Sequence, residues 1–375
     1  MQNARSLPAF SASSTPSPSG QVPWLERLSP WPEKFGLERM HVLLRELGDP
    51  QRRHPAIHVV GTNGKTTATR TIAALLQGKG LRTGAYTSPH VSGWSERIQV
   101  DGRDVDIEAA LARVRETSER LGATQFEVLT AAALLEFAEA HVDVAVVEAG
   151  LGGRLDATNV LDAKVVLLTN VALDHTAVLG ETRVEIAREK LAVAGPDAVV
   201  VLGEPEWAGL VPSGEVREGG AREAAEAFLG GPIEQEVDVQ LPGRLELRGN
   251  ELRDGAHNPA GVEWLVDRLP HSDYVLCVSI LADKDIDAML RGLSRAGDVL
   301  VATQSSNPRA LLVSELGRRA VPYFRRVEAI ADPAAALRRA RELAGPQGQV
   351  LVTGSLYLLA DLSASEARAY DEAPW

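Results

Sequence analysis

A glycine-rich segment at residues 61–67, GTNGKTT, combines backbone donors, a lysine and adjacent hydroxyls. It follows a short apolar run at 56–60 and precedes a helical pattern from Thr66 to about Lys79. Backbone N–H groups in such a strand-to-helix turn, with the positive end of the helix behind them, bind phosphate groups. Lys65 can then reach the β- and γ-phosphates of a nucleotide, and the Thr66 hydroxyl can reach Mg²⁺.

The full P-loop pattern needs a glycine where this chain has Val59. The match is therefore to a shortened form, G-x-x-G-K-T, placed between a strand pattern and a helix pattern. The alternative is an ordinary strand-to-helix turn that carries a solvated lysine. The surrounding strand and helix patterns favour the phosphate site.

Polar side chains also follow three apolar runs in the first half of the chain. Ser88 ends TGAYTS, Glu148 ends VAVVE, and His175 follows VVLLTN. Ligands of open α/β sheets bind beyond the carboxyl ends of the strands. Glu148 stands where a carboxylate of the Walker-B type would hold Mg²⁺, and Ser88 could supply a second hydroxyl. The alternatives are a turn-capping carboxylate, a Ser-Pro turn and a structural histidine.

The second half of the chain holds two more polar blocks. DGAHNP, residues 254–259, stands between a strand-like segment and a helix. Asn258 as the cap of a helix that starts at Pro259 explains this block as well as a binding role does. Arg244, in LPGRLE, could close its guanidinium over a phosphate. Lys190 lies in a helical run, and that pattern alone gives it no special status.

The elements that must position these groups alternate along the chain. Continuous apolar runs flanked by helical patterns are typical of strands in a parallel sheet covered on both faces. Such runs lie at 56–60, 142–150, 163–170, 274–280, 298–303 and 349–355, and amphipathic patterns predict helices at 107–121 and 127–141. Residues 203–240 are acidic and glycine-rich and contain no convincing strand. We expect an α/β fold with a domain boundary near 241–246 and a Ser/Pro-rich disordered leader, residues 1–23.

Length and composition narrow the class of protein. A chain of 375 residues is long enough for two domains, and its single cysteine, Cys277, excludes an intrachain disulfide. No apolar run approaches the roughly 18 residues of a membrane helix, and no basic tract is present to hold a nucleic acid. We expect a cytoplasmic monomer without nucleic-acid or membrane partners. The formal charge of -12 means that positive charge for an anionic ligand must be supplied locally.

A series of short blocks occurs in the order seen in one family. The blocks are GLERM (36–40), LGDP (47–50), HVVGTNGKTT, YTSPHVSGWSERI, TQFEVLTAAAL, VVEAGLGGRLDATNV, LDHTAVLGET, IAREK, LPGRLE, DGAHNPAG, LADKD and VTGSLYL. The chain resembles folylpolyglutamate synthase/dihydrofolate synthase, of the Mur ligase superfamily, from about residue 33 to 362. GTNGK and DGAHNP are typical of the superfamily, and GLERM, TSPH, TQFE and GLGGRLDATN narrow the resemblance to the folate branch.

The resemblance implies an ATP- and Mg-dependent ligase. Such an enzyme joins L-glutamate to dihydropteroate, to folyl(poly)glutamate, or to both, through an acyl phosphate, and gives ADP and phosphate. The implied architecture is a P-loop-type ATPase domain with a mostly parallel sheet, residues 24–241, and a smaller Rossmann-like glutamate-ligase domain, residues 242–375. The family's site lies in the cleft between its two domains.

The resemblance also implies roles for individual residues. The ATP-binding residues are Thr62, Asn63, Gly64, Lys65, Thr66, Thr67, Arg244 and Asp254. The ligands of a pair of Mg²⁺ ions are Thr66, Ser88, Glu148, His175 and Lys190, the last as a carbamate. The substrate contacts are Phe126, His257 and Ser355, and the catalytic set is Lys65, Glu148, His175, Lys190 and His257.

Two departures from the family keep other functions open. The loop reads GKTT where the folate branch has GKGS, and the short segment from Lys190 to Leu241 lacks the HQxxN block, so no adenine contact is assigned. The GKTT form favours a Mur-type UDP-muramyl amino-acid ligase, although only about 35 folded residues precede the P-loop, too few for a UDP-binding domain. The lost HQxxN block favours a nucleotide-binding regulatory protein without ligase activity.

Overall fold

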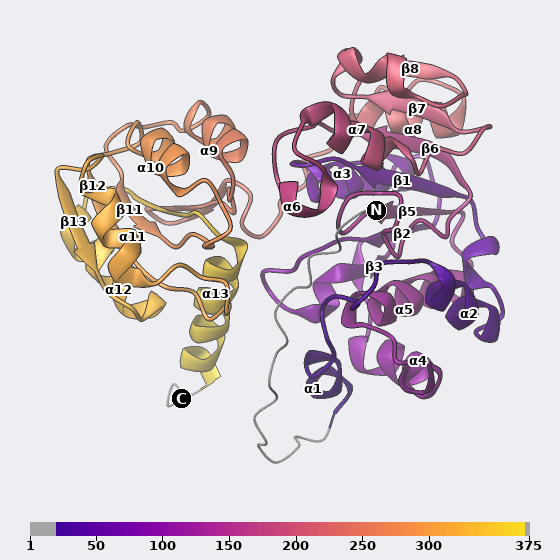
Figure 1. Ribbon diagram of the computed structural model, residues 1–375, viewed down its shortest axis with the longest axis horizontal. Coiled ribbons are helices and arrows are strands. Elements are labelled where there is room, and N and C mark those ends of the chain that lie inside the picture. The colour runs from indigo at the N-terminus through magenta and orange to yellow at the C-terminus, as the bar shows by residue number, and fades with distance from the viewer. Residues whose placement is uncertain (1–19, 372–375) are drawn as a thin grey trace, which may run out of the picture. The chain divides into compact units, whose positions relative to one another are not determined.

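The computed structural model describes residues 20–371 (Figure 1). The chain divides into two compact units, residues up to 88 with 94–239, and residues 89–93 with 240 onward. Most of the expected leader, residues 1–19, lies outside the described part. The first helix, α1, starts at Gln21, three residues before Trp24, where we expected folded sequence to begin. It starts there because the Glu108 carboxylate accepts the backbone N–H of Gln21 at 2.6 Å.

The first unit is built on an eight-stranded sheet in the order β4-β3-β2-β5-β1-β6-β7-β8. All neighbours pair in parallel except β2 with β3 and β3 with β4. The central strand, β1, lies between β5 and β6. Strands β2 to β5 lie on one side of it and β6 to β8 on the other. The strands are β1 (Ala56–Val60), β2 (Thr83–Tyr86), β3 (Ile98–Val100), β4 (Arg103–Asp104), β5 (Val144–Glu148), β6 (Ala163–Leu168), β7 (Val199–Leu202) and β8 (Val216–Glu218).

Helices cover both faces of this sheet, which explains why its central strands are largely apolar, with His58 in β1 and Glu148 at the end of β5 as exceptions. One face packs on α1, α2, α4 and α5, and the other on α3 and α8, while α7 covers β6 and β7 (Figure 1). The helices are α1 (Gln21–Glu26), α2 (Glu38–Glu46), α3 (Lys65–Gln77), α4 (Ile107–Leu121), α5 (Gln125–Glu139), α6 (Thr176–Leu179), α7 (Arg183–Leu191) and α8 (Ala221–Leu229), with 3₁₀ turns η1 (Pro50–Arg52), η2 (Trp94–Arg97) and η3 (Pro205–Leu210).

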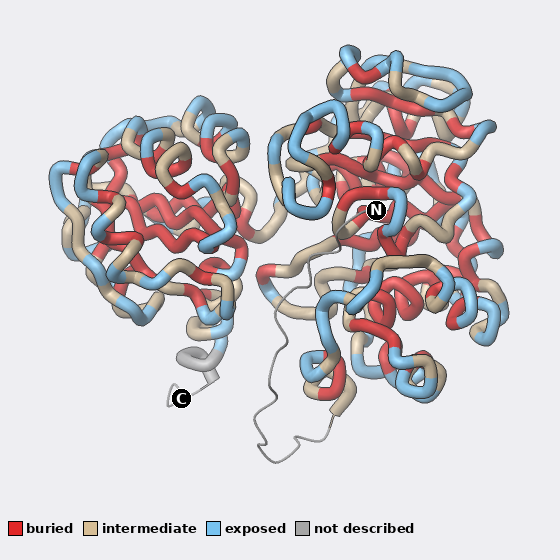
Figure 2. Tube along the Cα trace, in the orientation of Figure 1, coloured by how far each residue is buried: buried red, intermediate tan, exposed pale blue. Residues whose placement is uncertain are grey.

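The second unit has a six-stranded sheet in the order β13-β12-β11-β14-β10-β9, parallel except for β9. One face packs on α9, α10 and α11, and the other on α12 and α13. Figure 2 shows the interior strands of both sheets as buried. The elements are β9 (Glu246–Arg248), β10 (Glu251–Arg253), α9 (Pro259–Val266), β11 (Val275–Val278), α10 (Ile286–Leu293), β12 (Val299–Ala302), α11 (Val313–Ala320), β13 (Arg326–Ala329), α12 (Pro333–Ala344), β14 (Val350–Thr353) and α13 (Leu356–Asp371).

The expected α/β class with mainly parallel sheets is confirmed. Besides the end of the leader, which the start of α1 contradicts, a second local expectation is wrong. The segment 203–240 contains a strand, β8, as well as helix α8. The strand was missed because β8 is an edge strand whose side chains, Val-Arg-Glu, are largely exposed, so it has no apolar pattern. Its backbone pairing with β7 holds it in the sheet. Within the described residues, the structure has no helix long and apolar enough to cross a membrane.

Candidate functional site

The glycine-rich loop connects β1 to α3 at the carboxyl end of the central strand. Gly61 has φ +148, and a Cβ there would lie 1.9 Å from the Thr169 hydroxyl oxygen, so this position requires glycine. The loop is tied to the end of β6, because Asn170 accepts the N–H of Thr62 through its carbonyl at 3.0 Å and that of Asn63 through its side chain at 2.9 Å. The result is a fixed loop at the N-terminus of a 13-residue helix, where an anion is favoured.

Two lysines reach this loop from different helices. Lys65 Nζ donates to the carbonyls of Gly61 and Thr62, each at 3.2 Å. Lys190, on α7, is buried and its Nζ donates to the same Gly61 carbonyl at 2.8 Å. Burial, and then the charge of Lys65, lower the pKa of Lys190 to about 7. The sequence pattern did not distinguish Lys190 from an ordinary surface lysine. In the structure its amine is unusual because it is buried.

A second group of polar atoms meets at the end of β5. Glu148 is 2 % exposed, and its carboxylate accepts the Thr66 hydroxyl at 3.0 and 3.1 Å and the Ser88 N–H at 3.0 Å. The structure therefore brings together three of the five expected metal ligands. Thr67, the other hydroxyl of the loop, is exposed on α3.

These side chains fit a hard cation such as Mg²⁺, which prefers oxygen ligands. The hydroxyl of Thr66 and the carboxylate of Glu148 are in contact at a helix N-terminus beside the phosphate loop. Residues 20–371 contain no group of three His, Cys, Asp or Glu side chains that could hold a metal. His175 caps α6 in the left-handed region, and its backbone N–H donates to the Asp174 carboxylate at 2.9 Å.

The candidate residues of the second unit lie at the ends of its strands. Asp254 follows β10 and accepts the N–H groups of Leu245 at 3.0 Å and Ala256 at 2.8 Å. Burial raises the pKa of Asp254, and the Arg244 guanidinium acts in the opposite direction. His257 Nδ1 lies 2.8 Å from the Gly255 carbonyl, and the Ser355 hydroxyl accepts the Tyr357 N–H at 3.1 Å.

The block around Asp254 ends in the helix cap expected from the sequence. Asn258 accepts the Gly261 N–H at 2.8 Å, and Pro259 is the first residue of α9. The capping interpretation is therefore correct for Asn258. It does not account for Asp254 and His257, which are not part of the cap.

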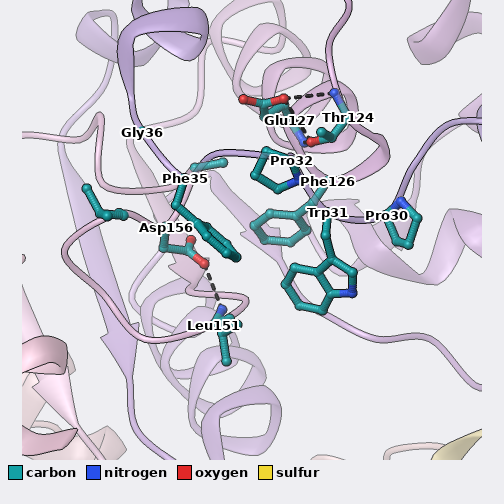
Figure 3. Close-up of a pocket in the computed structure, with 12 residues that line it drawn as sticks. Pro30, Trp31, Pro32, Phe35, Gly36, Thr124, Phe126, Glu127, Leu151 and Asp156 are labelled. Atoms are coloured by element: carbon teal, nitrogen blue, oxygen red, sulfur yellow. Dashed lines mark hydrogen bonds between the residues drawn. The ribbon is translucent and has the colours of Figure 1, made fainter. Parts of the chain in front are cut away.

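A small pocket with a cavity volume of about 40 Å³, partly open to solvent, lies on the α5 side of the first sheet (Figure 3). Figure 3 shows the rings of Trp31, Phe35 and Phe126 and the carboxylate of Asp156 around it. Gly150 lets the following loop approach Phe126, since a Cβ there would lie 2.5 Å from the ring. The other lining residues are Pro30, Pro32, Gly36, Thr124, Glu127, Leu151, Leu155 and Ala157.

The pocket collects residues from three of the blocks that point to the folate branch. Gly36 belongs to GLERM, Phe126 to TQFE and Asp156 to GLGGRLDATN. An ion pair joins two of these blocks, because Arg39 Nε donates to both oxygens of Glu127 at 3.0 and 2.9 Å. Sequence reasoning singled out Phe126 and missed Asp156, Trp31 and Phe35. The position of Asp156 within GLGGRLDATN could have identified it.

Two family models match this chain, one in each unit. The family model "Mur ligase middle domain" matches residues 59–195, and "Mur ligase, glutamate ligase domain" matches residues 243–356. The dihydrofolate synthase/folylpolyglutamate synthase of Mycobacterium tuberculosis is 34% identical over 78% of this chain and 80% of its own. The protein of the same name from Escherichia coli is 30% identical over 90% and 92%.

Solved structures give the same result. E. coli FolC in complex with DHPP and ADP has a TM-score of 0.83 at 29% identity, over 95% of this chain and all of that one. The Yersinia pestis bifunctional synthase with AMPPNP and Mn has a TM-score of 0.79 at 30% identity, over the same shares. The fold class and the ligase class expected from the sequence are confirmed. The chain belongs to the dihydrofolate synthase/folylpolyglutamate synthase family, ATP-dependent glutamate ligases of the Mur ligase superfamily.

Proposed function

We propose that this protein joins L-glutamate to the carboxylate of dihydropteroate, of folyl(poly)glutamate, or of both, with ATP converted to ADP and phosphate. The observation that carries this acceptor class is the pocket in which GLERM, TQFE and GLGGRLDATN meet. In this proposal residues 24–241 are the ATP-binding catalytic domain and residues 242–375 the glutamate-ligase domain. The protein acts as a cytoplasmic monomer on small molecules, without a nucleic-acid partner.

The side chains around the pocket suit a flat heteroaromatic ring that carries N–H groups. Trp31, Phe35 and Phe126 offer ring faces and edges, and aromatic contacts stabilise by about 0.5–1.5 kcal/mol beyond simple area burial. Asp156 is 6 % exposed, so its carboxylate offers an acceptor that water reaches poorly. A pterin ring, with its amino group and ring N–H, supplies donors for that carboxylate.

The reaction is a phosphoryl transfer followed by an acyl transfer. A carboxylate oxygen of the acceptor attacks the γ-phosphorus, the bond to the bridging oxygen of ADP breaks, and an acyl phosphate forms. The glutamate amine then attacks the carbonyl carbon, loses a proton, and phosphate leaves with the oxygen that made the attack. Both anionic partners of the first step must be brought together, so catalysis consists largely of positioning and charge stabilisation.

The first unit supplies that stabilisation from its own residues. The backbone N–H groups from Gly64 onward, at the start of α3, hold the phosphates, and Lys65 supplies an ammonium beside them. The N–H groups of Thr62 and Asn63 donate to Asn170 and keep the loop in place. Mg²⁺, when bound, neutralises charge on the transferring phosphoryl group. Its proposed ligands, for two ions, are Thr66, Ser88, Glu148, His175 and a Lys190 carbamate.

The residues of the second unit are proposed for the nucleotide and the amino acid. Arg244 and Asp254 are assigned to ATP, and His257 and Ser355 to the substrates. The buried Asp254 carboxylate accepts two backbone N–H groups, which fix its position and support its assignment to the nucleotide.

The experiment that tests this function measures ATP-dependent phosphate release with glutamate and one acceptor at a time. We expect release with dihydropteroate, tetrahydrofolate or both, and none with a UDP-muramyl peptide precursor. Release with the UDP-linked acceptor alone would replace the proposal with a Mur-type muramyl ligase. Nucleotide binding without release on any acceptor would identify a regulatory protein instead.

Phe126 offers a direct test of the acceptor pocket. Phe126→Ala is expected to raise the KM for dihydropteroate about 10- to 100-fold, because a ring contact worth roughly 1.5–3 kcal/mol is lost. The KM for ATP should stay within about two-fold. The control is Phe228→Ala, which removes a partly buried ring on the opposite face of the sheet. Equal effects of the two variants on the acceptor KM would contradict the assignment of this pocket.

A further inference from the structure

His58 is an unusual residue for the middle of a buried parallel strand. It lies on β1 and is completely buried, with its Nε2 2.8 Å from the Thr158 hydroxyl oxygen. Its Nδ1 has no hydrogen-bond partner among the described residues. Burial lowers the pKa of His58 to about 4, so the imidazole is neutral near pH 7. A neutral histidine kept in this position without full hydrogen bonding calls for a specific use.

The direction of the hydrogen bonds follows from the single proton of the Thr158 hydroxyl. That hydroxyl donates to Asp156 Oδ1 at 2.5 Å. Toward His58 the same oxygen must therefore accept, which places the imidazole proton on Nε2. The result is a one-way chain from His58 Nε2–H to the Thr158 hydroxyl and from there to the Asp156 carboxylate.

This series of hydrogen bonds determines how the two oxygens of the Asp156 carboxylate are oriented at the pocket. Oδ1 receives both donors of Thr158, the hydroxyl and the backbone N–H at 3.0 Å. Oδ2 accepts the Leu151 N–H at 2.7 Å, the contact drawn in Figure 3, where Asp156 lies at the pocket wall. The backbone of Gly150 is a further hydrogen-bond partner of Asp156, so a ligand N–H would share the carboxylate with the N–H groups of this loop.

We propose that Thr158 and His58 are positioning residues for acceptor recognition, which hold the Asp156 carboxylate in the orientation that accepts an N–H of the acceptor ring. Neither side chain lines the pocket, and both act through Asp156. The proposal rests on the proposed function, because it takes the occupant of the pocket to be a pterin ring. It adds that discrimination of the acceptor depends on a histidine within the central strand.

The first test compares two variants of Thr158 by steady-state kinetics and by calorimetric binding of dihydropteroate. Thr158→Val removes the hydroxyl at constant shape and is expected to raise the acceptor KM and Kd about ten-fold or more. The kcat at saturating acceptor and the KM for ATP should stay within about two-fold. Thr158→Ser keeps the hydroxyl and should lie within about three-fold of the wild type. Equal acceptor affinities of the valine and serine variants would overturn the proposal.

The second test asks whether His58 acts through the hydroxyl, and its single variant, His58→Leu, also serves if the valine variant folds poorly. His58→Leu alone is expected to weaken acceptor binding about three- to ten-fold, and in the Thr158→Val background it should have no further effect. Additive effects would overturn the chain. A wild-type protein that neither binds dihydropteroate nor releases phosphate with it would overturn the proposed function and this inference together. If the wild-type protein turns over dihydropteroate but the effects of Thr158→Val and His58→Leu are additive, the inference is overturned and the proposed function stands.

Discussion

Replacing Lys190 with alanine is expected to lower kcat about 10²- to 10³-fold. In the proposed mechanism its carbamate turns a cationic side chain into an anionic oxygen ligand for Mg²⁺, and loss of one such charge-stabilising group typically costs 10²–10³ in rate. Bicarbonate should not restore activity to Lys190→Ala, whereas a small carboxylate such as formate or acetate should restore part of it. The measurement is phosphate release with dihydropteroate and glutamate.

The burial of Lys190 supports this chemistry. A neutral amine attacks the carbon of CO₂, releases a proton to solvent and becomes a carbamate. With its pKa lowered to about 7, roughly half of the Lys190 amine is neutral near pH 7, whereas an exposed lysine is almost wholly protonated there. The matched control is Lys164→Ala, which removes an exposed lysine on β6. Activity of Lys190→Ala close to that of the control would reject the carbamate.

Replacing Lys65 with methionine is expected to lower kcat about 10³-fold and to weaken ATP binding. Methionine keeps an unbranched apolar side chain and removes the ammonium, so the effect measures the charge that the loop presents to the phosphates. The chain has a formal charge of -12, so a local cation is needed beside the nucleotide. The control is Lys79→Met, at an exposed lysine just beyond the end of α3.

The readouts are kcat and the ATP dissociation constant, each measured with Mg²⁺ present. An unchanged thermal midpoint of Lys65→Met would assign the loss to the site and not to folding. A change in kcat of less than about three-fold would contradict the phosphate role of the loop. In that case Lys65 would be the solvated lysine of an ordinary turn, the alternative that its sequence pattern leaves open.

Local patterns predicted the interior elements well, because burial on both faces makes a strand apolar along its whole length. The run at 56–60 coincides with β1, and the amphipathic pattern at 107–121 coincides with α4. Glu148 lies at the last position of β5, as its place after four apolar residues predicted. Edge strands such as β8 and β13 mix polar and apolar side chains that are exposed or half-buried, so they have no continuous apolar pattern. They form because their backbones pair with a neighbouring strand.

The site was predictable in the parts that follow strands and not in the parts that need tertiary packing. The contacts of Glu148 with Thr66 and Ser88 follow from neighbouring strand ends in one sheet. The pocket, in contrast, joins the segment before α2, the start of α5 and the loop after β5, and no local pattern relates these segments. His58 lies in an otherwise apolar strand, and no local pattern relates it to Thr158, which the structure places beside it.

The most direct test of the central claim follows one oxygen atom. Dihydropteroate labelled with ¹⁸O in both carboxylate oxygens is incubated with the enzyme, ATP, Mg²⁺ and L-glutamate, and the products are analysed by mass spectrometry. We predict that each phosphate released carries one ¹⁸O and that the new amide keeps the other, because the acceptor oxygen that attacks ATP leaves with the phosphate. Unlabelled phosphate, or phosphate formed without amide, would contradict ligation through an acyl phosphate.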